Sequence, residues 1–308
     1  MVTLEEVEEE NENTEDFSSA KIVFVTGAAG YLASHIILLL LQNGYKVRAT
    51  VKNIREKTKL NYLTELSNKY ARQLSVYQLD IMKKEDSFQK IIKNCSYIVH
   101  CAAPSTFRAS MESIDKCLDP IFQGTLEVLH MAMQESQRRS ESIIPREKNV
   151  PLRFLFIGTV ASSLNESGES AANNWNGDVD STDCFLLGKT LAEKATWECY
   201  NSDLSQRINF QCTSLLFPLL LGPFLSRNLS SSFFLLNLLA GTAAVPRGSL
   251  NYPIIDVRDA ASFCCNFLSP FLFFCFFSFP FLVPSFFPLS FFLPSPSLLC
   301  FSAFALIS

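Results

Sequence analysis

The chain has no Cys-x-x-Cys pair and only three histidines, so the spacings typical of metal-binding motifs are missing although ten cysteines are present. The cysteines are scattered through apparent strands and helices, which favours buried, reduced thiols over disulfides. A basic excess is also missing, because the formal net charge is -4 and the pI is near 5.5. We therefore expect no metal site and no nucleic-acid partner. The histidines lie in apolar segments, and core or neutral packing roles are expected for them rather than catalysis: His35, His100 and His130.

The N-terminus lacks basic residues and any apolar stretch. Its first sixteen residues hold eight carboxylates and no Lys or Arg. Residues 1–19 are therefore predicted to be a disordered acidic tail. No secretory signal is expected, because such a signal needs a basic start followed by an apolar segment. A cytoplasmic location follows from this pattern.

Asp, Glu, Lys, Arg and His are missing from the segment 261–308, which is composed largely of Phe, Leu, Ser, Pro and Cys. Phe, Ser, Leu and Pro share codons that begin with two pyrimidines, so we hypothesise non-coding sequence read through a splice site. The alternative is a membrane anchor, because about 20 apolar residues can span a bilayer. Prolines interrupt every candidate helix of this tail: Pro270, Pro280, Pro284, Pro288, Pro294 and Pro296. A membrane partner is expected only if the tail is genuine.

Between residues 20 and 217, β-rich segments alternate with helix-like segments. This alternation predicts βαβ units, and hence an α/β fold with a doubly wound, mostly parallel sheet covered on both faces. The predicted strands are 21–26, 46–51, 74–80, 96–104, 152–158 and 208–217, and the clearest helices are 31–44, 121–136 and 186–200. The polar segment 137–150 is predicted to be a surface loop.

A glycine motif lies between the first predicted strand and the first predicted helix, with Gly27, Gly30 and Ala33 at a G-x-x-G-x-x-A spacing. The first glycine permits a tight turn, the second lets the backbone approach a pyrophosphate, and the small third residue lets helix and strand pack closely. The helix N-terminus favours negative charge. The motif therefore predicts a dinucleotide site that includes Tyr31.

The end of the second predicted strand indicates which dinucleotide is bound. An acidic residue there would bind a ribose 2′-hydroxyl, whereas Arg or Lys accommodates a 2′-phosphate. This strand supplies Arg48 and Lys52 and no carboxylate, which favours NADP(H), unless both are ordinary surface charges. Asp80, after the third predicted strand, is a candidate acceptor for the adenine amine or a strand-end cap.

Seven segments occur in the order typical of the extended short-chain dehydrogenase/reductases: VFVTGAAGYLASH, VRATVK, the Leu-Asp pair of YQLDI, VHCAAP, KTLAEKATWE, LLFPLLLGPF and DVRDAA. From residue 21 to 261 the chain resembles the dihydroflavonol reductase and cinnamoyl-CoA reductase-like group of the NAD-dependent epimerase/dehydratase superfamily. The resemblance implies a Rossmann-type fold and an NADP(H)-dependent oxidoreductase acting on a carbonyl or CH–OH group of a small molecule. It also implies cofactor contacts from Cys101, Ala102, Ala103, Pro218 and Leu219.

The catalytic set that the resemblance implies is incomplete. Thr159 falls at the position of the hydroxyl that binds the substrate oxygen, and Lys189 at the position of the lysine that holds the ribose. Phe185 stands where the family has its tyrosine acid, and phenylalanine has no exchangeable proton. None of the eight tyrosines has a Lys four residues later. Two hypotheses stay open: an oxidoreductase with weakened activity, and a non-catalytic dinucleotide-binding protein or truncated inactive product.

The resemblance also divides the chain. It implies a Rossmann domain over residues 20–217 and the start of a substrate-binding lobe over residues 218–260. The resemblance stops where the low-complexity tail begins, so the C-terminal substrate lobe is expected to be truncated.

Overall fold

The computed structural model of the chain describes residues 21–83, 86–104, 114–142, 151–163, 183–225, 240, 254–268 and 300–302. The predicted acidic tail 1–19 and most of the segment 261–308 lie outside the described residues. No helix in the described part of the chain is both long and apolar enough to cross a membrane.

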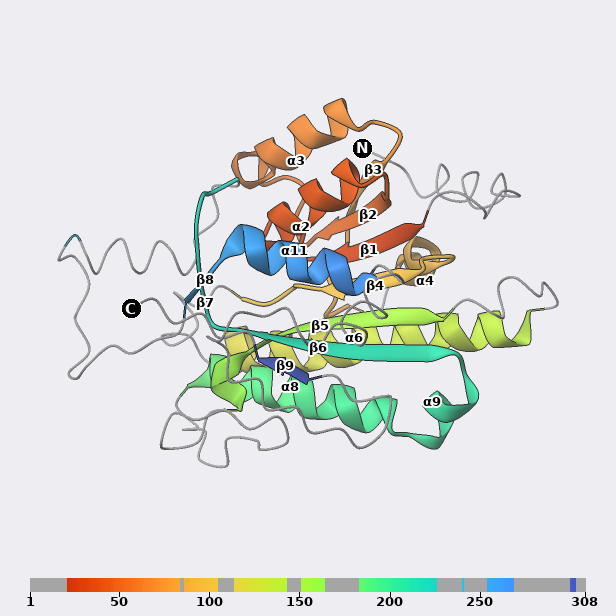
Figure 1. Cartoon of the computed structure of the whole chain (residues 1–308). Coiled ribbons are helices and arrows are strands. Elements are labelled where there is room, and N and C mark those ends of the chain that lie inside the picture. The colour runs from red at the N-terminus through yellow and green to blue at the C-terminus, as the bar shows by residue number, and fades with distance from the viewer. Residues whose placement is uncertain are drawn as a thin grey trace, which may run out of the picture.

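The described residues form a seven-stranded parallel sheet in the order β3-β2-β1-β4-β5-β6-β9 (Figure 1). Its strands are β1 (Ile22–Thr26), β2 (Lys46–Val51), β3 (Leu74–Gln78), β4 (Tyr97–His100), β5 (Leu152–Thr159), β6 (Phe210–Phe217) and β9 (Cys300–Ser302). The chain order reverses at β1, which lies between β2 and β4. Open α/β sheets bind their ligands at the carboxyl ends of the strands at such a reversal.

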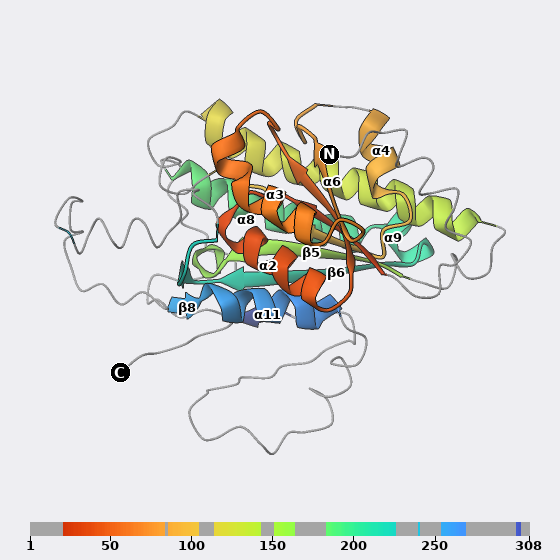
Figure 2. The ribbon, with the colours of Figure 1, turned by 90° about the horizontal axis from the view of Figure 1, so that it is seen from above.

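Helices cover both faces of the sheet, as the sequence predicts for a doubly wound fold (Figure 2). They are α2 (Tyr31–Gln42), α3 (Lys57–Lys69), α4 (Asp86–Ile92), α6 (Ile114–Glu141), α8 (Cys184–Tyr200), α9 (Asp203–Arg207) and α11 (Val257–Leu268), with a 3-10 turn, η1 (Val160–Ser162). Strand side chains alternate between two cores: Val23 and Val25 pack with α2, α3 and α11, whereas Ile22 and Phe24 pack with α4, α6 and α8. The α/β Rossmann-type prediction is confirmed.

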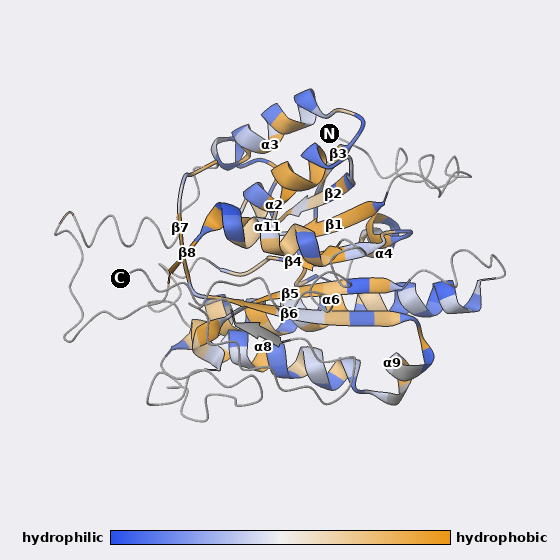
Figure 3. Cartoon of the chain, in the orientation of Figure 1, coloured by the Kyte–Doolittle hydropathy of each residue, from blue (hydrophilic) through white to orange (hydrophobic). Residues whose placement is uncertain are grey.

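The helix α6 is longer than predicted. It begins at Ile114, continues through Pro120 and ends at Glu141, so the first part of the expected loop 137–150 is helical. Figure 3 shows that this C-terminal part of α6 is hydrophilic, which explains why its sequence indicates a loop. His130 on this helix is exposed, so of the two packing roles expected for it the core role is wrong.

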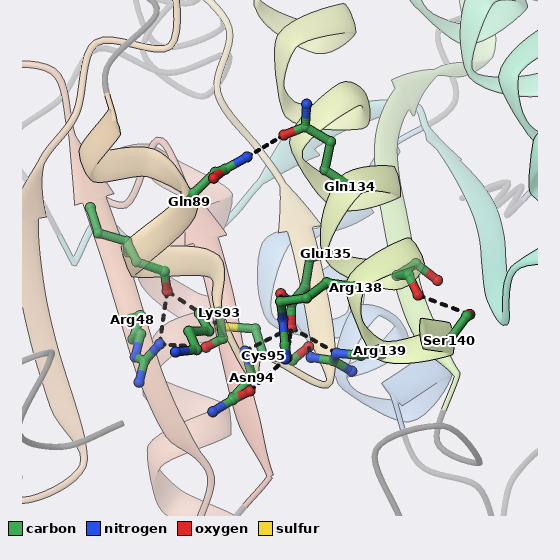
Figure 4. A network of polar contacts seen from close by, with 12 residues as sticks. Arg48, Gln89, Lys93, Asn94, Cys95, Gln134, Glu135, Arg138, Arg139 and Ser140 are labelled. Carbon is green, nitrogen blue, oxygen red and sulfur yellow. Dashed lines mark hydrogen bonds and ion pairs between the residues drawn. The ribbon is translucent and has the colours of Figure 1, made fainter. Parts of the chain in front are cut away.

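A buried cluster of polar side chains joins the C-terminal end of α6 to the segment of the chain that leads into β4 (Figure 4). Glu135 Oε1 accepts from the Asn94 backbone N–H at 2.9 Å and from Arg139 Nε at 2.8 Å. Arg138 Nε donates to Glu135 Oε2 at 2.8 Å, and Arg138 Nη2 donates to Asn94 Oδ1 at 2.9 Å. Asn94 has a φ of 65°, which places it in the left-handed region. These contacts join residues far apart in the chain. They stabilise the hydrophilic last turns of α6, which lie beyond its apolar part.

The segment 218–260 contributes a smaller parallel sheet of β7 (Leu219–Leu221) and β8 (Ile254–Asp256). The predicted boundary at residue 261 falls inside α11, which packs against α2 through Ala261, Cys264 and Leu268. These apolar residues recur at helical spacing, which predicts a helix. The spacing is therefore a better guide to this segment than its composition, which resembles that of the rest of the tail.

Candidate active site

The turn between β1 and α2 is shaped for close approach of a ligand backbone. Gly27 has a φ of +66°, and a Cβ there would lie 2.7 Å from the Cα of Ala102. Gly30 caps α2, and its N–H donates to the Gly27 carbonyl at 2.8 Å. No side chain caps α2 at this end, and its first turn carries no acidic residue. A helix start of this kind directs backbone N–H groups toward an anion, so the turn fits a dinucleotide pyrophosphate.

Two further residues of the motif lie at the same helix start. Ala33 is buried with 1 % of its surface exposed, as close contact of α2 with the sheet requires. The ring of Tyr31 lies 5.4 Å from that of Phe224 and 6.0 Å from that of His35. His35 Nε2 contacts the Pro223 carbonyl at 3.0 Å, so α2 also holds the segment that follows β7.

A buried chain of hydrogen bonds joins the ends of β1 and β4. The Ala102 N–H donates to Thr26 Oγ1 at 3.1 Å, and Thr26 Oγ1 lies 2.9 Å from His100 Nδ1. His100 Nε2 lies 3.0 Å from Thr125 Oγ1, whose hydrogen goes to the Ile121 carbonyl. Thr125 therefore accepts from Nε2–H, and His100 Nδ1 accepts from Thr26. The sequence predicts that His100 is buried, and this is confirmed. The sequence does not indicate its hydrogen-bond partners, because they come from three separate segments of the chain.

Burial, with a smaller contribution from the Lys189 charge, lowers the pKa of His100 to about 3. An unfolded histidine takes up a proton near pH 6.5, before the folded one does. We expect the unfolding free energy to fall as the pH drops from 6.5 toward 3, by up to about 1.4 kcal/mol per pH unit. Urea unfolding at pH 7 and pH 5 measures this slope. His100→Asn should reduce it, whereas the exposed control His130→Asn should keep it; equal slopes in all three proteins would refute the assignment.

The structure does not bring Arg48 to the ligand edge of the sheet. Arg48 is 2 % exposed, and its Nη1 donates to the Ile91 and Lys93 carbonyls at 2.9 and 2.8 Å (Figure 4). Alternation along β2 directs this side chain under α4. This placement corrects the prediction that Arg48 meets a 2′-phosphate.

Lys52 and Asp80 do lie together at the carboxyl ends of β2 and β3. Lys52 Nζ is 3.8 Å from Asp80 Oδ2, and the two side chains are 75 % and 19 % exposed. Asp80 Oδ1 also accepts from the Met82 N–H at 3.2 Å, which is the contact of a strand-end cap. An exposed cation thus remains at the end of β2, next to a carboxylate.

Thr159 and Lys189 are placed by β5 and α8. Thr159 ends β5, is half-buried, and its Oγ1 accepts from the Ala161 N–H at 3.4 Å. Lys189 is buried; its Nζ donates to the Ile157 carbonyl at 2.7 Å and lies 5.2 Å above the Phe156 ring. Burial lowers the pKa of Lys189 to about 8, against the opposing effects of Cys101 and Glu193.

Phe185 lies one helical turn before Lys189, in the first turn of α8. Asp183 caps this turn, since its Oδ1 accepts from the N–H groups of Phe185 and Leu186 at 3.1 and 2.9 Å. The Phe185 ring is half-buried against the core on the α6 and α8 side. The side chain offers no proton at the position that precedes the lysine by one turn.

The remaining predicted contacts follow β4 and β6. Ala102 lies against Gly27, while Ala103 is exposed. Cys101 is half-buried, and burial raises the pKa of its thiol to about 12, so it is no ready nucleophile. Pro218 is buried between β6 and β7, and Leu219 begins β7. All these residues follow the carboxyl ends of parallel strands.

The profile of the NAD-dependent epimerase/dehydratase family matches residues 23–269. The chain belongs to this family. The family resemblance drawn from the sequence is confirmed. The described residues contain no group of three or more His, Cys, Asp or Glu side chains that could hold a metal ion.

Curated relatives of the chain include plant reductases. The chain is 27 % identical over 247 residues to a cinnamoyl-CoA reductase of Medicago truncatula, covering 78 % of this chain and 70 % of that protein. It is 27 % identical over 245 residues to a bifunctional dihydroflavonol 4-reductase/flavanone 4-reductase of Pyrus communis, covering 77 % and 64 %. The chain thus spans about two thirds of the length of these relatives.

Solved structures share the fold. A yeast methylglyoxal/isovaleraldehyde reductase complexed with NADPH is similar with a TM-score of 0.60 at 22 % identity, covering 80 % of this chain and 73 % of that one. Vestitone reductase from alfalfa is similar with a TM-score of 0.56 at 23 % identity, covering 80 % and 73 %.

Proposed function

We propose that the chain is an NADP(H)-dependent oxidoreductase for a carbonyl or CH–OH group of a small molecule, with a slow hydride-transfer step. The observation that carries the proposal is the placement of the Gly27 turn, Thr159 and Lys189 at the carboxyl ends of one parallel sheet. A bound nicotinamide would supply or accept the hydride. Thr159 would donate a hydrogen bond to the substrate oxygen, and Lys189 would hold the ribose hydroxyls. We place this activity in the cytoplasm.

Lys52 supports NADP(H) over NAD(H). Its ammonium is exposed at the end of β2, where the ribose of the adenosine half would lie, and β2 has no carboxylate to bind a 2′-hydroxyl. The neighbouring Asp80 is compatible with a contact to the adenine. The NADPH in the yeast reductase agrees with this preference.

Thermal unfolding with NADPH or NADH tests the cofactor proposal. A ligand at about 100 times its Kd stabilises the native state by about 2.7 kcal/mol. We expect NADPH to raise the Tm clearly and NADH to raise it little. Lys52→Ala should weaken NADPH binding by roughly tenfold, because it removes one charge-assisted contact, whereas the control Lys69→Ala at the end of α3 should not. Equal shifts with both nucleotides would contradict the NADP(H) preference.

Phe185 favours a second candidate function, a dinucleotide-binding protein without catalysis. Losing a positioned general acid costs about 10²–10⁴-fold in rate. In this case the chain would bind the nucleotide and leave carbonyl substrates unchanged. The two candidates share the cofactor site and differ only in turnover, so restoring the missing proton donor separates them.

A further inference from the structure

A buried carboxyl group lies close to Thr159 and Lys189, the residues proposed to take part in the reaction. Glu193 is on α8, one turn after Lys189, with 2 % of its surface exposed. Its Oε1 accepts from Ser214 Oγ on β6 at 2.9 Å, and its Oε2 lies 3.0 Å from Ser162 Oγ on η1. One side chain therefore joins the helix of Lys189, the strand that leads to Pro218 and the turn that follows Thr159.

The hydrogens of this cluster can be counted. Ser162 Oγ lies 2.7 Å from the Thr159 carbonyl as well as 3.0 Å from Glu193 Oε2. A hydroxyl has one hydrogen, and a carbonyl can only accept. Ser162 therefore donates to Thr159, and its oxygen is left to accept from Glu193. An ionised Glu193 would draw that hydrogen away and leave two oxygen atoms 2.7 Å apart with no hydrogen between them.

The surroundings of Glu193 act in the same direction. Burial raises the pKa of Glu193, and the hydrogen bonds from Ser214 and Trp197 and the Lys189 charge only partly oppose it. In the part of the chain that the structure describes, the titratable groups that face the carboxyl are Lys189 on α8 and the Cys212 thiol on β6. Of these two groups, Lys189 directs a hydrogen bond of its ammonium to the Ile157 carbonyl, which does not belong to the Glu193 cluster.

We infer that Glu193 is a protonated carboxylic acid in the folded protein and is a positioning residue, which donates to Ser162 and accepts from Ser214. This arrangement holds the backbone of Thr159 at a set distance from α8 and hence from Lys189. The inference rests on the proposed function for the roles of Thr159 and Lys189, but the protonation of Glu193 does not depend on those roles.

Two substitutions test the protonation. Glu193→Gln keeps both contacts without a charge, since its amide N–H can donate to Ser162 and its oxygen can accept from Ser214. We expect its urea midpoint at pH 7 to be at or above that of the wild type, whereas the control Glu198→Gln on the exposed side of α8 should leave the midpoint unchanged. Glu193→Leu, which removes both contacts, should lower the midpoint clearly. A Gln midpoint as low as that of Leu would show that the folded protein needs the carboxylate, and would overturn the inference.

An infrared difference spectrum, wild type minus Glu193→Gln at pH 7, detects the proton directly. We expect the carbonyl stretch of a protonated carboxylic acid in the wild type; a carboxylate band in its place overturns the inference. Protonation in the folded state stabilises fully below the ordinary pKa of glutamate, near 4.3. The wild type should therefore lose stability relative to Glu193→Gln as the pH rises from about 4.3 to the raised pKa of the folded protein.

The nucleotide shift tests the positioning role. NADPH should raise the Tm of Glu193→Gln as much as that of the wild type, and should raise that of Glu193→Leu less, because Lys189 is displaced from the ribose. Equal shifts in all three proteins overturn the positioning role. A wild type that shows no NADPH shift instead contradicts the proposed function, and the midpoint and infrared results still decide the protonation of Glu193.

Discussion

Replacing Phe185 with tyrosine raises NADPH-dependent carbonyl reduction by about 10²–10⁴-fold, the usual contribution of a positioned general acid. Position 185 lies four residues before Lys189 on α8, so the two side chains lie on one face of the helix. A phenol there would donate its proton to the substrate oxygen, and the nearby ammonium would lower its pKa. The Phe185 ring is half-buried, so the added hydroxyl need not enter the tightly packed core.

The measurement is NADPH oxidation with a panel of aldehydes and ketones. Leu186→Tyr is the matched control, because it adds the same side chain to the same helix turn about 100° away from the Lys189 face. Both variants should show the wild-type NADPH shift in Tm. If Phe185→Tyr folds, binds NADPH and gains no turnover, the non-catalytic function is the correct one.

Glu135→Ala lowers the unfolding free energy by about 3–5 kcal/mol, the typical cost of removing one partner from a buried ion pair. Glu135 is 5 % exposed and accepts from Arg138, from Arg139 and from the Asn94 N–H. Without it, the Arg139 charge stays buried and unpaired. Urea unfolding at pH 7 measures the loss. Glu141→Ala, which removes an exposed contact with Gln137 on the same helix, should change stability by no more than about 0.5 kcal/mol.

The pH dependence of this loss identifies its cause. Burial by itself would raise the pKa of Glu135, but the hydrogen bonds and charges of Arg138 and Arg139 outweigh burial and lower it. A lowered pKa means that the stabilisation is present above the pKa of the unfolded residue and disappears as the pH falls through the folded pKa. The difference between wild type and Glu135→Ala should shrink on acidification. A difference that stays constant would indicate lost apolar contacts instead.

The sequence alone determined the parts of this protein that depend on local geometry. Gly27, Gly30 and Ala33 are recognisable because a tight turn, a close approach and a close helix–strand contact each restrict the residue type at a set spacing. Six strands of the parallel sheet are recognisable because buried strands are continuous apolar runs between helix-like segments. The position of Lys189, and the missing hydroxyl at Phe185, follow from the family resemblance, and α8 places the two residues one helical turn apart.

Only the tertiary structure decided where the polar side chains find their partners. Arg48 turns under α4, His100 joins Thr26 to Thr125, and Glu193 joins Ser162 to Ser214. Each of these contacts joins elements that are distant in the sequence, so neither spacing nor composition indicates it. A buried polar group must find a hydrogen-bond partner, and the folded arrangement of the elements decides which one it finds.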